Sequence, residues 1–190
     1  MTDAPDPAFK MLLNNAVGFL NRAIRDAGNR PNALAIGVYT AIELVLKARL
    51  AHEHWSLMVT KSPNRTKFEA GDFVSVSFDD ACIRLRDIVQ EPLPDETREA
   101  FDDLRKIRNR LVHFSPPEEA FYGLEAASIT TATRMAALKA WYLLVKLMKE
   151  DWKQTFEPYA LEVEAIEVAG RRAEGSWDEM IRNPALRTGG

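Results

Sequence analysis

The feature that most constrains the fold is a segment, residues 31–54, whose apolar side chains lie nearly all around a helical axis. Pro31 opens the segment, which suits the first turn of a helix because no backbone N–H is needed there. A helix that is apolar on every side must be covered on every side, so we expect it to be central and buried. Its apolar residues are Leu34, Ile36, Val38, Ile42, Leu44, Val45, Leu46 and Leu50.

Other segments repeat apolar residues at steps of three and four, which is the period of an α-helix. No series of alternating segments that would build a sheet is visible. The further helices that we expect run over residues 7–26, 77 to about 88, 95–113, 124–153 and, as a short helix, 161–169.

The breaks between these helices carry recognisable boundary residues. Residues 56–77 interrupt the period and predict a loop, with at most a short extended piece at 74–78. Ser77 is a typical N-cap, and acidic residues follow it in the first turn, where negative charge is favoured. Residues 115–118, Ser-Pro-Pro-Glu, are typical of another helix start.

These patterns predict an all-α protein, an up-and-down bundle of four to five main helices plus short accessory helices. The 190 residues fit one domain. We place that domain at residues 1–158 and expect a short helix followed by a loose tail in residues 159–190.

Composition excludes several classes of function. The net charge of -3 argues against broad, non-specific binding of nucleic acid, so any such contact needs a local basic cluster. The single cysteine, Cys82, excludes an internal disulfide and a cysteine-based zinc site, and we expect it on a buried helix face.

The chain also lacks the sequence patterns of secretion, membrane insertion, metal binding and phosphate-loop cofactor binding. The first six residues do not form a signal-peptide pattern, and no apolar run is long enough to span a membrane, so we expect a cytoplasmic protein. His52 and His54 are two apart and face different sides of a helix, so no metal site is expected. No glycine-rich phosphate loop is visible, and no cofactor is expected.

Residues 108–113, Arg-Asn-Arg-Leu-Val-His, hold the side chains best suited to chemistry. Arg108 can neutralise a phosphate without losing its own charge, and His113 can transfer a proton near neutral pH. On a straight helix the two are about 140° apart, whereas Asn109 lies within about 40° of His113. Arg108 and His113 can meet at one phosphate if the helix ends near Val112, or if two subunits pair.

An alternative interpretation is a solvated helix end. Arg105, Lys106, Arg108 and Arg110 would then favour the negative end of the helix dipole, with His113 as a capping residue. In the functional interpretation Arg105, Lys106 and Arg110 are the local basic cluster that contacts RNA.

Glu43 is an acid within the apolar segment, and its burial requires a partner. Lys47, four residues later, favours an ion pair within the helix. The alternative is that Glu43 reaches the fourth long helix and holds Arg108 in position.

Residues 108–113 resemble the arginine–histidine motif of the HEPN superfamily, in the version where Asn or Asp follows the arginine. Residues 41–50 are similar to the second helix of HEPN proteins, and residues 77–81 leading to 104–109 have a similar layout. The resemblance covers roughly residues 8–155.

This resemblance implies a helical bundle, a homodimer with two motifs in one cleft, and metal-independent endoribonuclease activity. Many members are toxins or abortive-infection effectors, and some are silent binding modules. In one toxin subgroup the antitoxin modifies a tyrosine two positions after the histidine. That position is Ser115 here, so neutralisation of that kind is not expected.

The sequence thus favours a homodimeric RNase in which His113 moves the proton, Arg108 stabilises the phosphorane and Asn109 positions the substrate. The alternative is a non-catalytic HEPN module that binds nucleotide, RNA or a protein partner, such as an antitoxin or a component of a defence complex.

Overall fold

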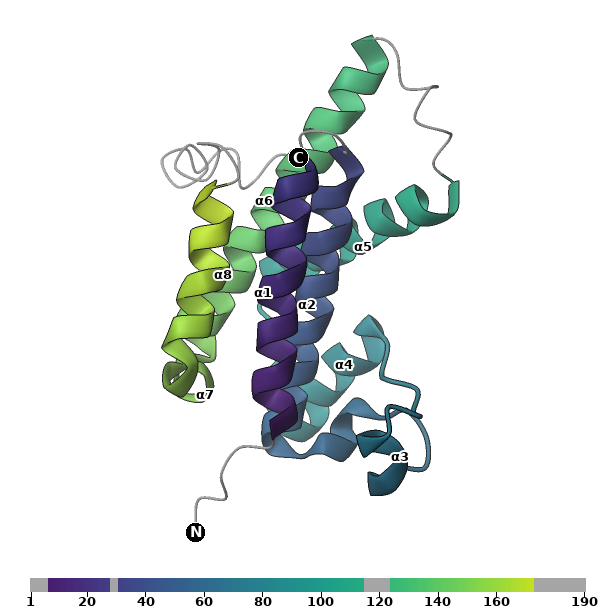
Figure 1. Ribbon diagram of the computed structural model, residues 1–190, viewed down its shortest axis with the longest axis vertical. Coiled ribbons are helices and arrows are strands. Elements are labelled where there is room, and N and C mark those ends of the chain that lie inside the picture. The colour runs from purple at the N-terminus through teal and green to yellow at the C-terminus, as the bar shows by residue number, and fades with distance from the viewer. Residues whose placement is uncertain (1–6, 28–30, 115–123, 173–190) are drawn as a thin grey trace.

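The computed structural model describes residues 7–27, 31–114 and 124–172. The protein is all-α over these residues, as predicted, and a single antiparallel bridge joins Val59 to Ser75. The elements (Figure 1) are α1 (Pro7–Ala27), α2 (Pro31–Glu53), the 3₁₀ turn η1 (Trp55–Met58), α3 (Arg65–Glu69), α4 (Phe78–Arg84), the π-turn η2 (Leu85–Val89), α5 (Asp95–Phe114), α6 (Leu124–Lys146), the π-turn η4 (Leu147–Asp151), α7 (Lys153–Phe156), the 3₁₀ turn η5 (Glu157–Tyr159) and α8 (Ala160–Arg172).

Helix α2 is the central helix, as its all-round apolar pattern predicts. It lies side by side with α1 and also contacts α4, α5 and α6 (Figure 1). Most of its apolar side chains are buried, while Ile36 and Leu44 are half-buried. The fully or nearly fully buried ones are Leu34, Val38, Ile42, Val45, Leu46 and Leu50.

Gly37 allows α1 and α2 to approach closely. A Cβ atom added at Gly37 would overlap the Cβ of Ala23 and would lie 3.2 Å from the Phe19 carbonyl oxygen. Both of these atoms belong to the rigid framework of α1, so the helices would have to move apart. A Cβ atom added at Gly18, on α1 itself, would have no atom within 4 Å apart from those of its chain neighbours and of the adjacent helix backbone.

We expect Gly37→Ala to lower the free energy of unfolding by about 1–2 kcal/mol, because overpacking outweighs alanine's better helix propensity. Gly18→Ala is the matched control and should raise it by about 0.5–1 kcal/mol, since only the propensity changes. Urea denaturation of both variants measures the difference. A Gly37→Ala variant as stable as Gly18→Ala would contradict the close approach.

The segment predicted as a loop, residues 56–77, is more ordered than its sequence pattern indicated. It contains η1 and the short helix α3, and only one bridge forms where an extended piece was expected. The ring of Phe68 lies 5.0 Å from that of Trp55 and 4.9 Å from that of Phe73, measured between centroids. These three half-buried rings form a local cluster, which helical periodicity cannot reveal in so short a helix.

The predicted start of α4 is confirmed. The Ser77 hydroxyl accepts a hydrogen bond from the backbone N–H of Asp80 at 3.1 Å, as an N-cap does. Cys82 is buried on this helix, also as predicted, and burial raises the pKa of its thiol to about 11. The helix ends in the π-turn η2, and Gln90 then adopts a left-handed conformation.

The predicted helix over residues 124–153 begins where expected but does not stay regular. It is α-helical to Lys146, passes through the π-turn η4 and bends at Trp152. Helix α8 is longer than the predicted 161–169 and packs against α1 and α6. The Trp141 indole N–H donates to the Ile166 carbonyl at 3.0 Å, so α8 shares the core although it lies beyond residue 158.

The loose tail expected from Gly170 onward does not begin there, because residues 170–172 belong to α8. The rest of that tail and the predicted helix start at 115–118 lie outside the described residues. Across the part of the chain that the structure describes, no helix is long and apolar enough to cross a membrane.

Candidate functional site at the junction of helices α2, α4 and α5

Helix α5 carries the residues of interest and is fixed to the bundle by its first half. Phe101 and Leu104 are fully buried, and the helix packs against α2 and α6. Its last turn leaves the bundle: Val112 is 48% exposed and Phe114 is 79% exposed (Figure 1). The helix therefore presents a half-buried middle, with Arg108 and Asn109, and an exposed end, with His113.

Arg108 lies at the junction of α5 with α2. Its Nη1 donates to the Asn109 Oδ1 at 3.0 Å, and its Cζ lies 5.7 Å from the centroid of the Tyr39 ring. Its Nε is buried and has no hydrogen-bond partner. No carboxylate of the described residues forms an ion pair with it, so no described acid competes with an incoming anion for this guanidinium.

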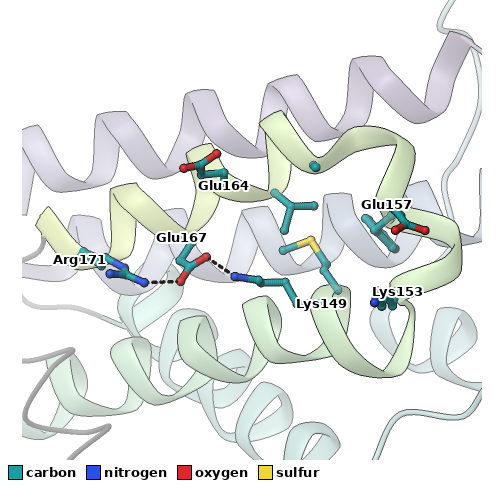
Figure 2. A pocket seen from close by; sticks show the side chains of 10 residues that line it. Lys149, Lys153, Glu157, Glu164, Glu167 and Arg171 are labelled. Carbon is teal, nitrogen blue, oxygen red and sulfur yellow. Dashed lines mark hydrogen bonds and ion pairs between the residues drawn. The ribbon is translucent and has the colours of Figure 1, made fainter.

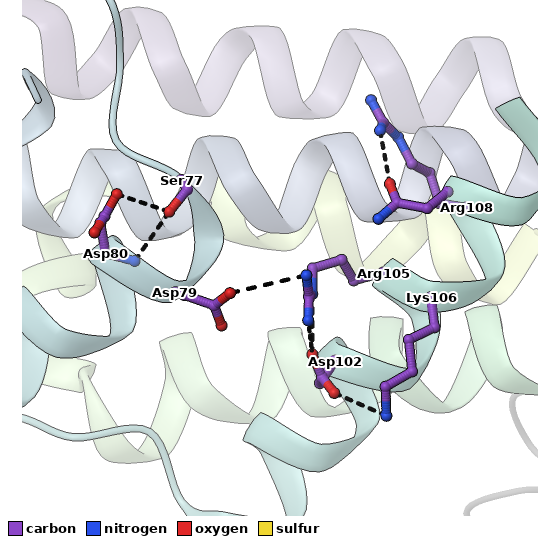
Figure 3. Close-up of polar contacts among 8 residues, drawn as sticks. Ser77, Asp79, Asp80, Asp102, Arg105, Lys106 and Arg108 are labelled. Atoms are coloured by element: carbon purple, nitrogen blue, oxygen red, sulfur yellow. Dashed lines mark hydrogen bonds and ion pairs between the residues drawn. The ribbon is translucent and has the colours of Figure 1, made fainter. Parts of the chain in front are cut away.

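Arg105 is placed differently, although it is only one turn away (Figure 3). Its Nη2 lies 2.6 Å from the Asp102 Oδ1, and its Nη1 lies 3.8 Å from the Asp79 Oδ2 on α4. Lys106 Nζ also lies 2.9 Å from the Asp102 Oδ2. Hydrogen bonds from Lys106 and Arg105 hold the pKa of Asp102 below its ordinary value.

The basic cluster predicted from α5 thus divides into two parts. Arg105 and Lys106 are neutralised locally by acids. Arg110 is exposed and, like Arg108, pairs with no carboxylate in the described part of the chain. The sequence carries a signal for this division: Arg108 and Arg110 have no acid three or four residues away, whereas Arg105 and Lys106 do.

Tyr39 is a site residue that the sequence pattern did not single out. It is buried on α2 below Arg108. Burial raises the pKa of its phenol, the charge of Glu43 raises it further, and Arg105 and Arg108 oppose the rise. A usable signal was its place four residues before Glu43, on the same face of α2.

Neither contact expected for Glu43 is formed. No ion pair within 4 Å joins it to Lys47 or to Arg108 among the described residues. The physical reason is its position: Glu43 and Lys47 are both half-buried, so water still reaches the carboxylate and a protein cation is not required. Glu43 acts on the site through its charge beside Tyr39.

His113 is exposed, and its ring meets the Phe114 ring edge-on at 6.2 Å between centroids. Helix α5 continues through His113 to Phe114, so it does not end near Val112. The separation of about 140° between the directions of Arg108 and His113 therefore persists. One chain brings Arg108, Asn109 and Tyr39 together but does not bring His113 to them.

The described residues contain no group of three or more His, Cys, Asp or Glu placed to hold a metal ion. His54 Nδ1 lies 2.7 Å from the Ser56 Oγ, and the His52 ring meets the Phe9 ring edge-on at 5.7 Å. The two histidines therefore contact different parts of the chain.

A concavity of about 460 Å³ lies between α8 and the segment formed by η4 and α7 (Figure 2). Lys149 and Arg171 both pair with Glu167, at 2.7 Å and 2.6 Å. Burial raises the pKa of Glu167, but hydrogen bonds from Lys149 and Arg171 outweigh it and the pKa is lowered. Because these two cations are neutralised, this concavity is a weaker candidate for an anion than Arg108.

Comparisons with protein-family models, with curated proteins and with solved structures found no match. The candidate site therefore rests on its own geometry: an unneutralised arginine held by an asparagine and a buried tyrosine, and an exposed histidine five residues later on the same helix.

Proposed function

We propose that this protein is a metal-independent endoribonuclease of the HEPN type that acts as a toxin or an anti-phage effector. The observation that supports the proposal is the state of Arg108. It is half-buried, oriented by Asn109 and paired with no carboxylate of the described residues, while its neighbour Arg105 pairs with Asp102. A phosphodiester is the anion that a planar, permanently charged guanidinium suits best.

RNA supplies its own nucleophile, so these side chains suffice for the reaction. The 2′-hydroxyl oxygen attacks the adjacent phosphorus, and the bond to the 5′-oxygen breaks. His113 accepts the 2′-hydroxyl proton and then returns it to the leaving 5′-oxygen, so the proton count is unchanged. Arg108 stabilises the negative charge that builds on the phosphorane oxygens. The products are a 2′,3′-cyclic phosphate and a 5′-hydroxyl.

Asn109 contributes in two ways. Its carbonyl oxygen accepts the hydrogen bond from Arg108 and orients the guanidinium. This leaves its amide N–H groups to donate to a phosphate oxygen. Arg110 adds a second cation that no described carboxylate neutralises, and we assign it to the flanking RNA backbone.

The proposed site is composite and is formed by two copies of the chain. Val112 and Phe114 flank His113 and expose apolar surface at the end of α5, which a second copy would cover. A two-fold pairing of these ends would bring His113 of one copy to Arg108 of the other. It would thereby overcome the angular separation within one helix.

Mixing two inactive variants tests this arrangement. A heterodimer of Arg108→Gln with His113→Ala has one composite site with both residues intact, so activity should return to about a quarter of the wild-type level. The readout is cleavage of a labelled RNA after the variants are denatured and refolded together, with each variant alone as control. A mixture as inactive as its components, or a wild-type enzyme that is active as a strict monomer in light scattering, would contradict the composite site.

One observation favours a second candidate, a non-catalytic module that binds RNA, nucleotide or a protein partner. Arg105 and Lys106 are neutralised, and Arg108 and His113 are separated within the chain. Expression of the protein in cells distinguishes the two candidates. An RNase should arrest growth when expressed, and its His113→Ala variant should not. A binding module should have the same effect on growth with and without His113.

A further inference from the structure

Two aromatic rings lie beneath the two arginines of the site. Tyr39 of α2 and Phe78 of α4 are both buried, with their ring centroids 6.4 Å apart. The guanidinium carbon of Arg108 lies 5.7 Å from the Tyr39 centroid, and that of Arg105 lies 5.9 Å from the Phe78 centroid. The junction of α2, α4 and α5 therefore contains two parallel arginine–aromatic pairs.

The pairs differ in what else holds the arginine. Arg105 is held by the carboxylates of Asp102 and Asp79 (Figure 3), which fix it and also cancel its charge. Among the described residues, the partners of the Arg108 guanidinium are the Asn109 carbonyl and the Tyr39 ring, and neither carries a net charge. An aromatic face attracts a guanidinium without carrying a net charge. It can therefore fix the side chain and leave its charge for another anion.

We propose that Tyr39 is the positioning residue of Arg108: its ring holds the guanidinium in place while leaving its charge for a substrate phosphate. This inference rests on the proposed function for the identity of the phosphate. The ring is the acting group, not the hydroxyl. Because the pKa of Tyr39 is raised, the phenol stays neutral and supplies no anion to compete with the phosphate.

The first test needs neither substrate nor activity. The Nε–H of Arg108 is buried, so its proton should exchange slowly and give its own signal in ¹⁵N-resolved NMR. We expect contacts between this proton and the Tyr39 ring protons in the wild-type protein. Arg108→Lys identifies the signal. A wild-type spectrum in which the assigned signal shows no contact with the Tyr39 ring overturns the proposal, whether or not any variant folds.

Three variants extend the test. Tyr39→Phe keeps the ring and should leave the Arg108 signal in place. Tyr39→Leu removes the ring, so the signal should shift and exchange faster with water. Phe78→Leu, the matched control, removes the ring beneath Arg105 and should shift the Arg108 signal less than Tyr39→Leu does, because Phe78 packs against Tyr39 while its own arginine is Arg105. A signal that stays in Tyr39→Leu, in protein that unfolds cooperatively, contradicts the positioning role.

The second test measures affinity for a non-cleavable RNA whose 2′-hydroxyls are methylated. Tyr39→Phe should bind within about twofold of wild type, and Tyr39→Leu about tenfold more weakly. In the Tyr39→Leu background, Arg108→Gln should cause little further loss, because both changes remove one interaction. Additive losses contradict coupling between Tyr39 and Arg108. A wild-type protein that neither binds nor cleaves RNA contradicts the proposed function instead, and the NMR result still decides the role of Tyr39.

Discussion

The His113→Ala variant is expected to cleave RNA about 10²–10⁴-fold more slowly than the wild-type protein, which is the usual contribution of a positioned proton carrier. His113 is exposed at the end of α5 and hydrogen-bonds to no described residue. Its removal should therefore leave the melting temperature unchanged. Single-turnover cleavage of an end-labelled RNA, together with a thermal melt, measures both effects.

Arg108→Gln should lower the rate by a similar factor, about 10²–10³-fold, because the phosphorane loses its principal cation. Arg108→Lys should not restore full activity, since an ammonium cannot reproduce the planar, two-pronged contact. Added chelator should have no effect on the wild-type rate.

Matched controls for these variants lie elsewhere in the chain. His52→Ala removes a histidine from α2, and Arg86→Gln removes an exposed arginine that pairs with its neighbour Asp87. Both should cleave at the wild-type rate. Cleavage that stops with chelator, or that survives both His113→Ala and Arg108→Gln, would rule out the proposed mechanism.

The largest expected effect on stability concerns Arg49. Its side chain is only 3% exposed, and it pairs with Glu53 at 2.7 Å and with Glu91 at 3.0 Å. Glu91 follows the left-handed Gln90 and precedes Pro92, in the link between η2 and α5. The buried arginine thus ties the link before α5 to the central helix.

Removing both acids together, in Glu53→Ala/Glu91→Ala, leaves a buried cation without an anion. Because the side chains of Glu53 and Glu91 are 44% and 41% exposed, water screens both pairs, and we expect the free energy of unfolding to fall by about 2–3 kcal/mol. The melting temperature should fall by roughly 5–10 °C in a protein of this size. Arg49→Met should cost less, because it removes the buried charge along with its pairs.

Asp87→Asn provides the matched control, since it breaks an exposed pair with Arg86 that contributes little. Urea denaturation measures all three variants. A double variant that is as stable as Asp87→Asn would show that Arg49 does not depend on its acids.

The same ion pairs make stability depend on pH, with a definite sign. The hydrogen bond from Arg49 lowers the pKa of Glu53 below its ordinary 4.5. A carboxyl whose pKa is lowered by folding stabilises the protein above its unfolded value and loses that contribution as the pH falls through the folded value. The difference in unfolding free energy between wild type and the double variant should therefore shrink between pH 7 and about pH 3.5. A difference that is the same at both pH values would contradict this linkage.

Local sequence patterns predicted much of the fold, because helices are stabilised by neighbours three and four residues away. The bounds of α1, α2 and α5, the Ser77 cap and the burial of Cys82 follow from such patterns. The ring cluster that orders residues 56–77 and the π-turn after Lys146 did not follow from them. The ring cluster depends on contacts made across a non-helical segment, and the π-turn depends on a local break in helical hydrogen bonding; neither follows the helical period.

The sequence by itself determined an all-α protein with a buried central helix, and it placed an arginine, an asparagine and a histidine near the end of α5. Helical spacing also indicated Asp102 as a partner of Arg105 and Lys106, whereas only the tertiary structure decided which side chains of other helices meet the arginines of α5. Arg105 and Arg108 are the same residue type one turn apart, yet Asp79 of α4 comes to Arg105 and Tyr39 of α2 comes to Arg108. Charge compensation depends on distance in space, and helical periodicity reports only neighbours along one helix.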